Sequence, residues 1–212
     1  YSDLIIGADQ NDAGGSSAGR VYLYDYFMKN EIIPDLSMTG ASGNRFGYSV
    51  SSAGDVNGDG YSDVIVGAFG YSSNTGRAYI HFGGPSMDNT EDVTMTGEAI
   101  SNFFGISVSS AGDVNGDGYS DVIVGADQYS SSTGRAYVYF GGATMNNIAD
   151  VTMTGDTAGD EFGTSVSTAG DVNGDGYSDV IVGAYQYSSS TGRAYIYFGG
   201  ASVNNTADLT MT

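Results

Sequence analysis

The sequence predicts an all-β fold in which a four-stranded antiparallel module is repeated along the chain. A nine-residue segment, Asp-Val-Asn-Gly-Asp-Gly-Tyr-Ser-Asp, occurs at 55–63, 113–121 and 171–179, so its copies are 58 residues apart. The composition, with 34 Gly, 17 Tyr and 2 Pro, favours tight turns between aromatic-rich strands. No helical periodicity of apolar residues persists along the chain.

Each 58-residue period contains four strand-like segments, of which the first two flank the nine-residue segment. In one copy the first, 46–52, alternates between large and small side chains, which predicts Phe46, Tyr48 and Val50 on one face. The second, 63–68, is short, β-branched and nearly all apolar. That pattern is typical of a strand buried on both faces.

The third and fourth segments complete the module. Residues 77–82 alternate again, and His81 stands where the other copies have Tyr, which predicts a tolerated outward residue with no catalytic role. Residues 92–96 are short and polar enough to form the outer edge of a sheet. Gly-rich and Asn/Ser-rich linkers separate the four segments, as expected for antiparallel connections.

Shorter motifs recur at the same spacing: Phe-Gly, Val-Ile-Val-Gly-Ala, Thr-Gly-Arg-Ala-Tyr and Met-Thr. A degenerate copy without the first strand precedes them, because Tyr1-Ser2-Asp3 matches the end of the nine-residue segment. The chain is therefore predicted to be one region, 1–212, with 15 strands. Its approximate repeat units are 1–40 (partial), 41–97, 98–155 and 156–212.

Four antiparallel strands per period predict a β-propeller blade, with about four blades in this chain as an incomplete ring or as part of a larger propeller. A parallel β-helix or a stacked sandwich array also gives a long all-β repeat. We favour the propeller because β-helix coils are usually shorter than this period.

The composition excludes several classes of function. The formal net charge is −19, and acidic residues number 25 against 6 basic ones, which disfavours nucleic acid and anionic membranes as partners. The chain has no Cys and one His, which removes disulfides and thiolate metal sites and leaves no set of catalytic residues. No apolar run is long enough to insert into a membrane.

The nine-residue segment has the oxygen-ligand spacing of a calcium loop. Positions 1, 3, 5 and 9 carry Asp, Asn, Asp and Asp, Gly occupies position 6, and the carbonyl of position 7 is a further ligand. The oxygen donors favour Ca²⁺ over zinc or copper. The candidate metal residues of about three Ca²⁺ sites are Asp55, Asn57, Asp59, Tyr61 and Asp63; Asp113, Asn115, Asp117, Tyr119 and Asp121; and Asp171, Asn173, Asp175, Tyr177 and Asp179.

Two other calcium-binding motifs resemble this loop, and two alternatives to the interpretation stay open. An EF-hand requires Glu at position 12, where this chain has Val66, Val124 or Val182, and a strand rather than a helix is expected next. A dockerin module fails for the same reason. The loops could instead be metal-free Asx turns. If they do hold calcium, a structural role is favoured over a direct or regulatory one.

Two further sets of residues are candidates for binding. Arg20, Arg77, Arg135 and Arg193 share one repeat position, which indicates either an anion-binding ring or a repeated hydrogen bond or ion pair between blades. The segments 69–71, 127–129 and 185–187 differ between copies and combine aromatic and amide side chains that could stack on sugars. Packing between blades is the simpler explanation. The segments 41–45, 98–103 and 156–161 also differ.

Taken together, Phe-Gly, then Asp-Val-Asn-Gly-Asp-Gly-Tyr-Ser-Asp, then Val-Ile-Val-Gly-Ala resemble the FG-GAP repeat of integrin α-subunit propellers and their microbial relatives. The resemblance covers essentially the whole chain. It implies a propeller blade with the calcium loop between the first two strands, at the rim away from the usual ligand face. Phe69, Asp127 and Tyr185 stand where many family members have Pro.

Propellers of this family usually have more blades than the four represented here. The chain is therefore expected to be a fragment of a larger propeller, although assembly of several copies or an open array would also satisfy the pattern.

The leading functional hypothesis is a calcium-stabilised, non-catalytic module of a secreted or cell-surface protein that mediates adhesion, protein–protein interaction or assembly. The resemblance supplies the adhesion part. The expected partners are a protein or glycan ligand and either further blades or other copies that complete the ring. The alternatives are a lectin-like propeller and a non-catalytic accessory domain of a larger secreted enzyme.

Overall fold

Four antiparallel sheets follow one another along the chain in the computed structural model, which describes residues 3–24 and 34–212. Tyr1 and Ser2 of the degenerate copy lie outside the described residues. Sheet 1 contains β1 (Leu4–Ala8), β2 (Arg20–Tyr24) and β3 (Leu36–Thr39); sheet 2 contains β4 (Ser49–Gly54), β5 (Asp63–Ala68), β6 (Arg77–His81) and β7 (Val93–Thr96); sheet 3 contains β8 (Ser107–Gly112), β9 (Asp121–Ala126), β10 (Arg135–Tyr139) and β11 (Val151–Thr154); sheet 4 contains β12 (Phe162–Gly170), β13 (Asp179–Ala184), β14 (Arg193–Tyr197) and β15 (Leu209–Met211).

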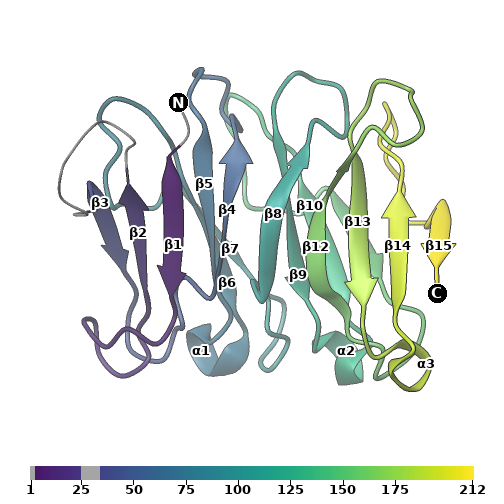
Figure 1. Ribbon diagram of the computed structural model, residues 1–212, viewed down its shortest axis with the longest axis horizontal. Helices are drawn as coiled ribbons and strands as arrows, with labels where there is room; N and C mark the ends of the chain where they lie inside the picture. The colour runs from purple at the N-terminus through teal and green to yellow at the C-terminus, as the bar shows by residue number, and fades with distance from the viewer. Residues whose placement is uncertain (1–2, 25–33) are drawn as a thin grey trace.

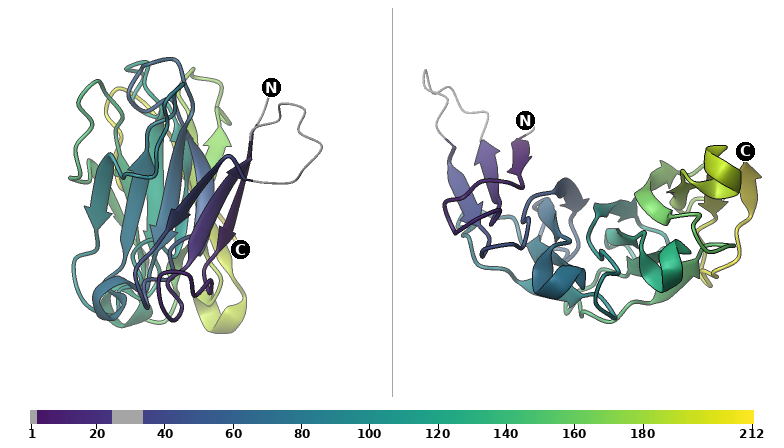
Figure 2. Two further views of the ribbon diagram at one scale, coloured as in Figure 1. Left: turned by 90° about the vertical axis from the view of Figure 1, so that its left-hand side faces the viewer. Right: turned by 90° about the horizontal axis from the view of Figure 1, so that it is seen from below.

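Within each sheet the strands are hydrogen-bonded in the order in which they occur in the sequence (Figure 1). Seen end-on in Figure 2, the sheets lie side by side along an arc that does not close. For residues 3–24 and 34–212, these features confirm the prediction of 15 strands in successive four-stranded blades, the first lacking its first strand, and of an incomplete ring.

The second strand of each complete sheet forms the centre of the core. All six residues of β5 and of β9 are buried, as their β-branched sequence predicts for a strand covered on both faces. The fourth strand is short and lies at the edge of its sheet, also as predicted. It begins at Val93 rather than at residue 92.

Two different faces meet wherever one sheet packs on the next. The forward face of a sheet carries Ala, Val, Ile and Met, and the rear face of the following sheet carries Phe, Val, Ala and Tyr. Between sheets 3 and 4 the forward face consists of Ala111, Val114, Ile123, Ala136, Val138, Val151 and Met153, and the rear face consists of Phe162, Val166, Val180, Val182, Ala184, Tyr195 and Tyr197. The core is therefore a series of inter-sheet layers rather than one central cluster.

The Phe-Gly motif closes each of these junctions. Phe104 is 1% exposed, and its backbone forms a parallel bridge with Gly76 of the preceding sheet. Gly76 has a φ of +85°, and a Cβ at this position would overlap the main chain of Phe104. The same bridge joins Gly19 to Phe46 and Gly134 to Phe162. These glycines are therefore required both for their backbone conformation and for the close approach of the next sheet.

The short segments α1 (Tyr71–Asn74), α2 (Tyr129–Ser132) and α3 (Tyr187–Ser190) are single turns with left-handed residues. In α2, Ser130, Ser131 and Ser132 have φ values of 48°, 60° and 60°. The left-handed backbone conformation costs a residue with a side chain roughly 1–2 kcal/mol. The turn presents carbonyl groups to the next sheet, since Gly159 N donates to Ser131 O at 3.1 Å and Glu161 N to Ser132 O at 2.8 Å. We did not predict these turns.

Two predictions about side-chain direction were wrong. The first strand of sheet 2 begins at Ser49, not at residue 46, because the chain turns after Phe46. Phe46 is consequently buried while Tyr48 is 48% exposed, so the two do not share a face. His81 does not point outward, because it is 2% exposed with its ring edge-on to that of Phe46. Burial lowers the pKa of His81 below its ordinary value.

The inter-sheet layers predict a matched pair of mutational effects. Met153 is 1% exposed, whereas Met211, at the same repeat position, is 49% exposed. Met153→Ala should lower the free energy of unfolding by about 2–5 kcal/mol, because it leaves a cavity between sheets 3 and 4. Met211→Ala should lower it by less than about 1 kcal/mol. Urea unfolding measures both, and equal losses would contradict the layered core.

Candidate metal centres

The three predicted calcium loops lie at corresponding places in sheets 2, 3 and 4. Each connects the first strand to the second, on the edge of the arc opposite α1, α2 and α3 (Figure 1). The pairing of the two strands shifts by one residue just before each loop, as between Ser52 and Gly54. This irregularity ends the ladder and lets the chain leave the sheet.

Hydrogen bonds to the first Asp shape the loop. In the loop at 55–63, Asp55 Oδ1 accepts from Gly58 N at 2.7 Å, and its Oδ2 accepts from Gly60 N at 2.9 Å. Asn57 Nδ2 donates to Asp59 Oδ2 at 2.9 Å. Gly58 and Gly60 have φ values of 77° and 90°, which the tight turn requires. The side chains at positions 1, 3 and 5 therefore gather inside one turn.

The last Asp of the loop is the first residue of the buried second strand. Asp63 is 0% exposed, and it accepts hydrogen bonds from Val56 N at 2.8 Å and from Gly83 N at 2.7 Å. Burial raises the pKa of Asp63, and the negative charges of Asp59 and Asp55 raise it further. The loop thus brings three carboxylates close enough to repel one another.

The second and third loops repeat this arrangement. Asp121 accepts from Val114 N at 2.8 Å and from Gly141 N at 2.8 Å, and burial raises its pKa to about 7. Asp179 accepts from Val172 N at 2.8 Å and from Gly199 N at 2.9 Å. The structure brings together the carboxyl and amide side chains of Asp113, Asn115, Asp117 and Asp121, and likewise those of Asp171, Asn173, Asp175 and Asp179, with Tyr119 and Tyr177 at position 7.

The donor set fits a hard divalent cation. The loops contain no basic side chain, and their polar side chains offer carboxylate and amide oxygens. Among residues 3–24 and 34–212, the Asp, Glu and His side chains form no preassembled cluster of three or more in ligand geometry. The carboxylates instead accept hydrogen bonds from the N–H groups of their own loop. Each carboxylate oxygen has a second lone pair, so these hydrogen bonds leave it able to accept a cation.

The repeated arginines have a structural explanation. Each donates from Nε to the Thr of the adjacent fourth strand, as Arg135 does to Thr154 at 3.0 Å. Arg135 also forms an ion pair with Glu98 at 2.7 Å, across the junction between sheets 2 and 3, and lies 3.6 Å from the ring centroid of Tyr129. Arg77 stacks in the same way on Tyr71, and Arg193 on Tyr187. The predicted contact between blades is thus present as an ion pair at Arg135 and Arg193, whereas the repeated hydrogen bond to Thr lies within one sheet.

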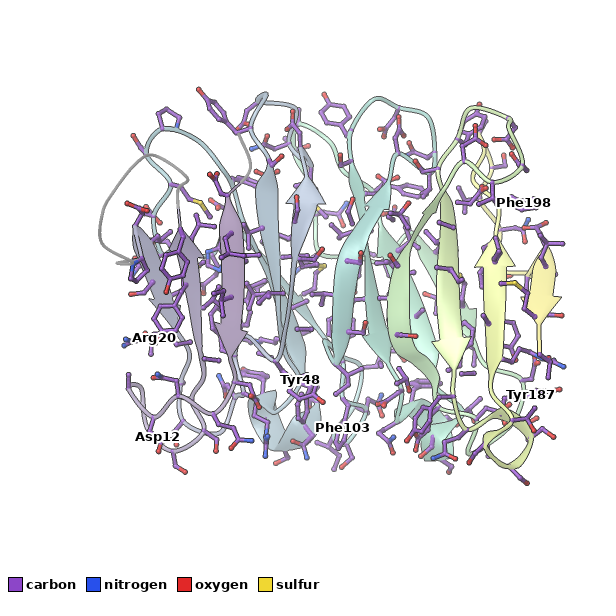
Figure 3. The ribbon with its side chains drawn as sticks, viewed as in Figure 1. Asp12, Arg20, Tyr48, Phe103, Tyr187 and Phe198 are labelled. Carbon is purple, nitrogen blue, oxygen red and sulfur yellow. The ribbon has the colours of Figure 1, made fainter. Side chains whose placement is uncertain are left out.

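The segments that differ between copies meet each other at the junctions, on the edge that carries α1 to α3. Arg45 pairs with Asp9 at 3.2 Å in the first junction, whereas the Phe69 and Phe103 rings lie 5.3 Å apart in the second. The Tyr48 ring lies edge-on to that of Phe69, with ring centroids 4.6 Å apart, and Figure 3 shows Tyr48 and Phe103 along this edge. The Phe69 and Phe103 rings therefore pack between sheets, whereas Tyr71, Tyr129 and Tyr187 of the same segments stack on the arginines of their own sheets.

The third junction places two acids at the same positions, Asp127 and Glu161. Asp127 is 7% exposed and its Oδ1 has no hydrogen-bond partner among the residues that the structure describes. Burial, and then the charge of Glu161, raise the pKa of Asp127 to about 6. Sequence reasoning missed this contact, because the two residues are far apart in the chain and only the repeat register aligns them.

Comparison with known proteins identifies the repeat. A family model described as the FG-GAP repeat matches residues 46–81, 104–139 and 162–197. Curated relatives include integrin alpha-PS2 of Drosophila melanogaster, 34% identical over 204 residues, and integrin alpha-4 of Xenopus laevis, 32% identical over 198 residues. These alignments cover 86% and 89% of this chain but 14% and 18% of the relatives. The chain therefore spans less than a fifth of the length of either relative.

Within the described part of the chain, no helix has the length and apolar character needed to cross a membrane.

The raised pKa of Asp121 predicts an unusual pH dependence in the metal-free protein. A carboxyl group whose pKa is higher in the folded state binds its proton more tightly there. Its contribution to stability is present at about pH 4 and is lost as the pH rises through about 7. Chelator-treated protein should therefore melt at a higher temperature at pH 5 than at pH 7.

The variant Asp121→Asn cannot titrate, so its melting temperature should depend less on pH than that of the unaltered protein. Asp88→Asn, at a fully exposed position outside the loops, is the matched control for the loss of one charge. Equal pH slopes for the unaltered chain and Asp121→Asn would contradict the assignment.

Proposed function

The chain belongs to the FG-GAP repeat family, and we propose that it is a calcium-stabilised, non-catalytic propeller module of an extracellular or cell-surface protein that serves adhesion, protein–protein interaction or assembly. The observation that carries the calcium part is the threefold occurrence of one arrangement: a buried Asp beside two further carboxylates in a loop without a basic residue. The membership in a family with integrin α subunits supports the adhesion part.

The residues proposed to hold each ion are the side chains at positions 1, 3, 5 and 9 and the carbonyl at position 7. In the first loop these are Asp55, Asn57, Asp59, Asp63 and Tyr61. Two carboxylates about 4 Å apart repel by roughly 4 kcal/mol at an effective dielectric constant of about 20. A bound Ca²⁺ replaces this repulsion by attraction and holds the connection between the first two strands.

The proposed role of the ions is structural. The chain has no Cys, so disulfides cannot strengthen it. A cation that binds only the folded state adds roughly 2.7 kcal/mol of stability at 100 times its dissociation constant. Three such ions would contribute as much as the disulfides of other extracellular modules.

A protein or glycan ligand is proposed to bind on the edge opposite the calcium loops. The support is the sequence variation along this edge, where the Asp9–Arg45 ion pair, the Phe69–Phe103 stack and the acidic residues of the third junction replace one another. Scaffold positions repeat, whereas positions that recognise a ligand need not. The absence of catalysis is a further proposal, supported by the burial of His81 and by the location of loop carboxylates in hydrogen-bonded turns.

Further sheets of the same kind, or other copies of the chain, are proposed to pack against the ends of the arc. Met211 and Leu209 on the forward face of sheet 4 are each 49% exposed, whereas Met153 and Val151 at the same positions of sheet 3 are 1% and 7% exposed. At the other end, Leu4 and Ile6 on sheet 1 are 57% and 43% exposed. Apolar surface of this kind favours association.

Calcium titration tests the proposed function. The chain should bind about three Ca²⁺ ions, and its melting temperature should drop on addition of a chelator. The double variant Asp113→Asn, Asp117→Asn should bind one ion fewer, because it removes two carboxylates from the second loop. Isothermal titration calorimetry measures the number of bound ions, and differential scanning calorimetry measures the melting temperature. An unchanged stoichiometry, or a melting temperature that does not respond to calcium, would refute the assignment.

A further inference from the structure

The three candidate loops are hydrogen-bonded to one another in series. Ser120 N in the second loop donates to the main-chain oxygen of Asp55 in the first, at 2.9 Å. Ser178 N in the third loop donates to the main-chain oxygen of Asp113 in the second, at 3.0 Å. Each bond joins position 8 of one loop to position 1 of the loop before it.

This bond uses the same peptide group as a proposed ligand. The N–H of Ser120 and the C=O of Tyr119 are the two ends of one planar peptide unit. Its N–H end is fixed by the first loop, and its C=O end is the position-7 donor of the second. A cation on the Tyr119 carbonyl would polarise the unit and strengthen the bond from Ser120 N to Asp55 O.

Two further contacts hold a loop against the sheet that follows it. Gly142 N, in the connection after the third strand of sheet 3, donates to Val56 O at 2.8 Å, and Gly200 N donates to Val114 O at 2.8 Å. The ring of Tyr119 lies against Gly58 at position 4 of the first loop, where a Cβ would come 2.5 Å from the ring carbon Cε1. Each of the first two loops is therefore braced by the following sheet: by its loop at positions 1 and 4, and by the connection after its third strand at position 2.

We propose that the three loops bind calcium cooperatively, each ion ordering the preceding loop through the peptide between positions 7 and 8. The proposal rests on the calcium-binding function proposed above and adds the coupling between its sites. By linkage, the coupling acts equally in both directions between two neighbouring loops. It connects the first loop to the second and the second to the third.

The third loop differs from the other two. Val172 is 50% exposed, whereas Val56 and Val114 at the same position are 0% and 2% exposed. Asp171 and Asn173 are exposed, while their counterparts in the first two loops are half-buried. Since the described residues place no following loop against it, the third loop is less preorganised and binds calcium most weakly.

The sign of the coupling separates this mechanism from plain electrostatics. Two bound cations repel each other, so a purely Coulombic interaction between neighbouring sites would lower the second affinity. Coupling through the shared peptide raises it. At about 0.15 M salt the Debye length is about 8 Å, which weakens the Coulombic part between exposed loops.

The test is a calcium titration of the full chain followed by ¹⁵N NMR, with the position-6 amides of Gly60, Gly118 and Gly176 as separate reporters of the three loops. In the unaltered chain, the reporter of the third loop should saturate last. In Asp113→Asn, Asp117→Asn, which disables the second loop, the Kd of the first and third loops should rise by about five-fold or more. In Asp88→Asn, which removes one charge outside the loops, the three Kd values should stay within about two-fold.

A second pair of variants keeps every carboxylate. Tyr119→Ala removes the ring that braces Gly58, so it should weaken binding in the first loop, whose own residues are unchanged. Tyr48→Ala is the control, because it removes a 48% exposed ring on the edge opposite the loops. It should leave the reporters of all three loops within about two-fold.

The outcomes separate the two proposals. If the first and third loops keep their Kd values when the second is disabled, or bind calcium more tightly, the coupling is wrong although calcium binding stands. If no reporter responds to calcium in the unaltered chain, the proposed function fails and the coupling with it.

Discussion

The packing of one sheet's forward face on the rear face of the next is the constraint on which the rest of the structure depends. A four-stranded sheet with two apolar faces cannot be stable alone, and here each face finds its partner in the neighbouring repeat. The fit requires Met on one side, Phe on the other and Gly where the backbones touch, as at Gly76 and Phe104. These residues recur every 58 positions because each junction imposes the same demand.

The same stacking sets the spatial relation of the candidate metal centres. Because each loop leaves its sheet at the same point, neighbouring loops come into direct contact along one edge of the arc. Their hydrogen bonds join main-chain groups, and the ring of Tyr119 adds a side-chain contact with Gly58. The opposite edge carries the left-handed serine turns and the residues that differ between copies. The fold thus separates a repeated edge, which carries the candidate metal centres, from a variable one.

Much of this architecture follows from sequence periodicity. The repeat length, the four strands per sheet, the buried second strand and the location of the nine-residue loops were all predicted from residues such as Asp55 and Val64. The failures were local. Alternation predicted Tyr48 to share a face with Phe46, but the turn after Phe46 interrupts the alternation before the strand begins at Ser49. His81 was expected to face outward because its repeat partners are Tyr, and those tyrosines are buried as well. The contacts between loops were not predictable, because a spacing along the chain says nothing about which backbone groups of successive repeats meet.

The most direct test of the account is a crystal structure of the chain grown at saturating calcium, with the ions located by their anomalous scattering. We expect one ion in each of the three loops, held by the side chains at positions 1, 3, 5 and 9 and by the carbonyl at position 7, with the hydrogen bonds from Ser120 to Asp55 and from Ser178 to Asp113 retained. Loops without anomalous density at saturating calcium would contradict it.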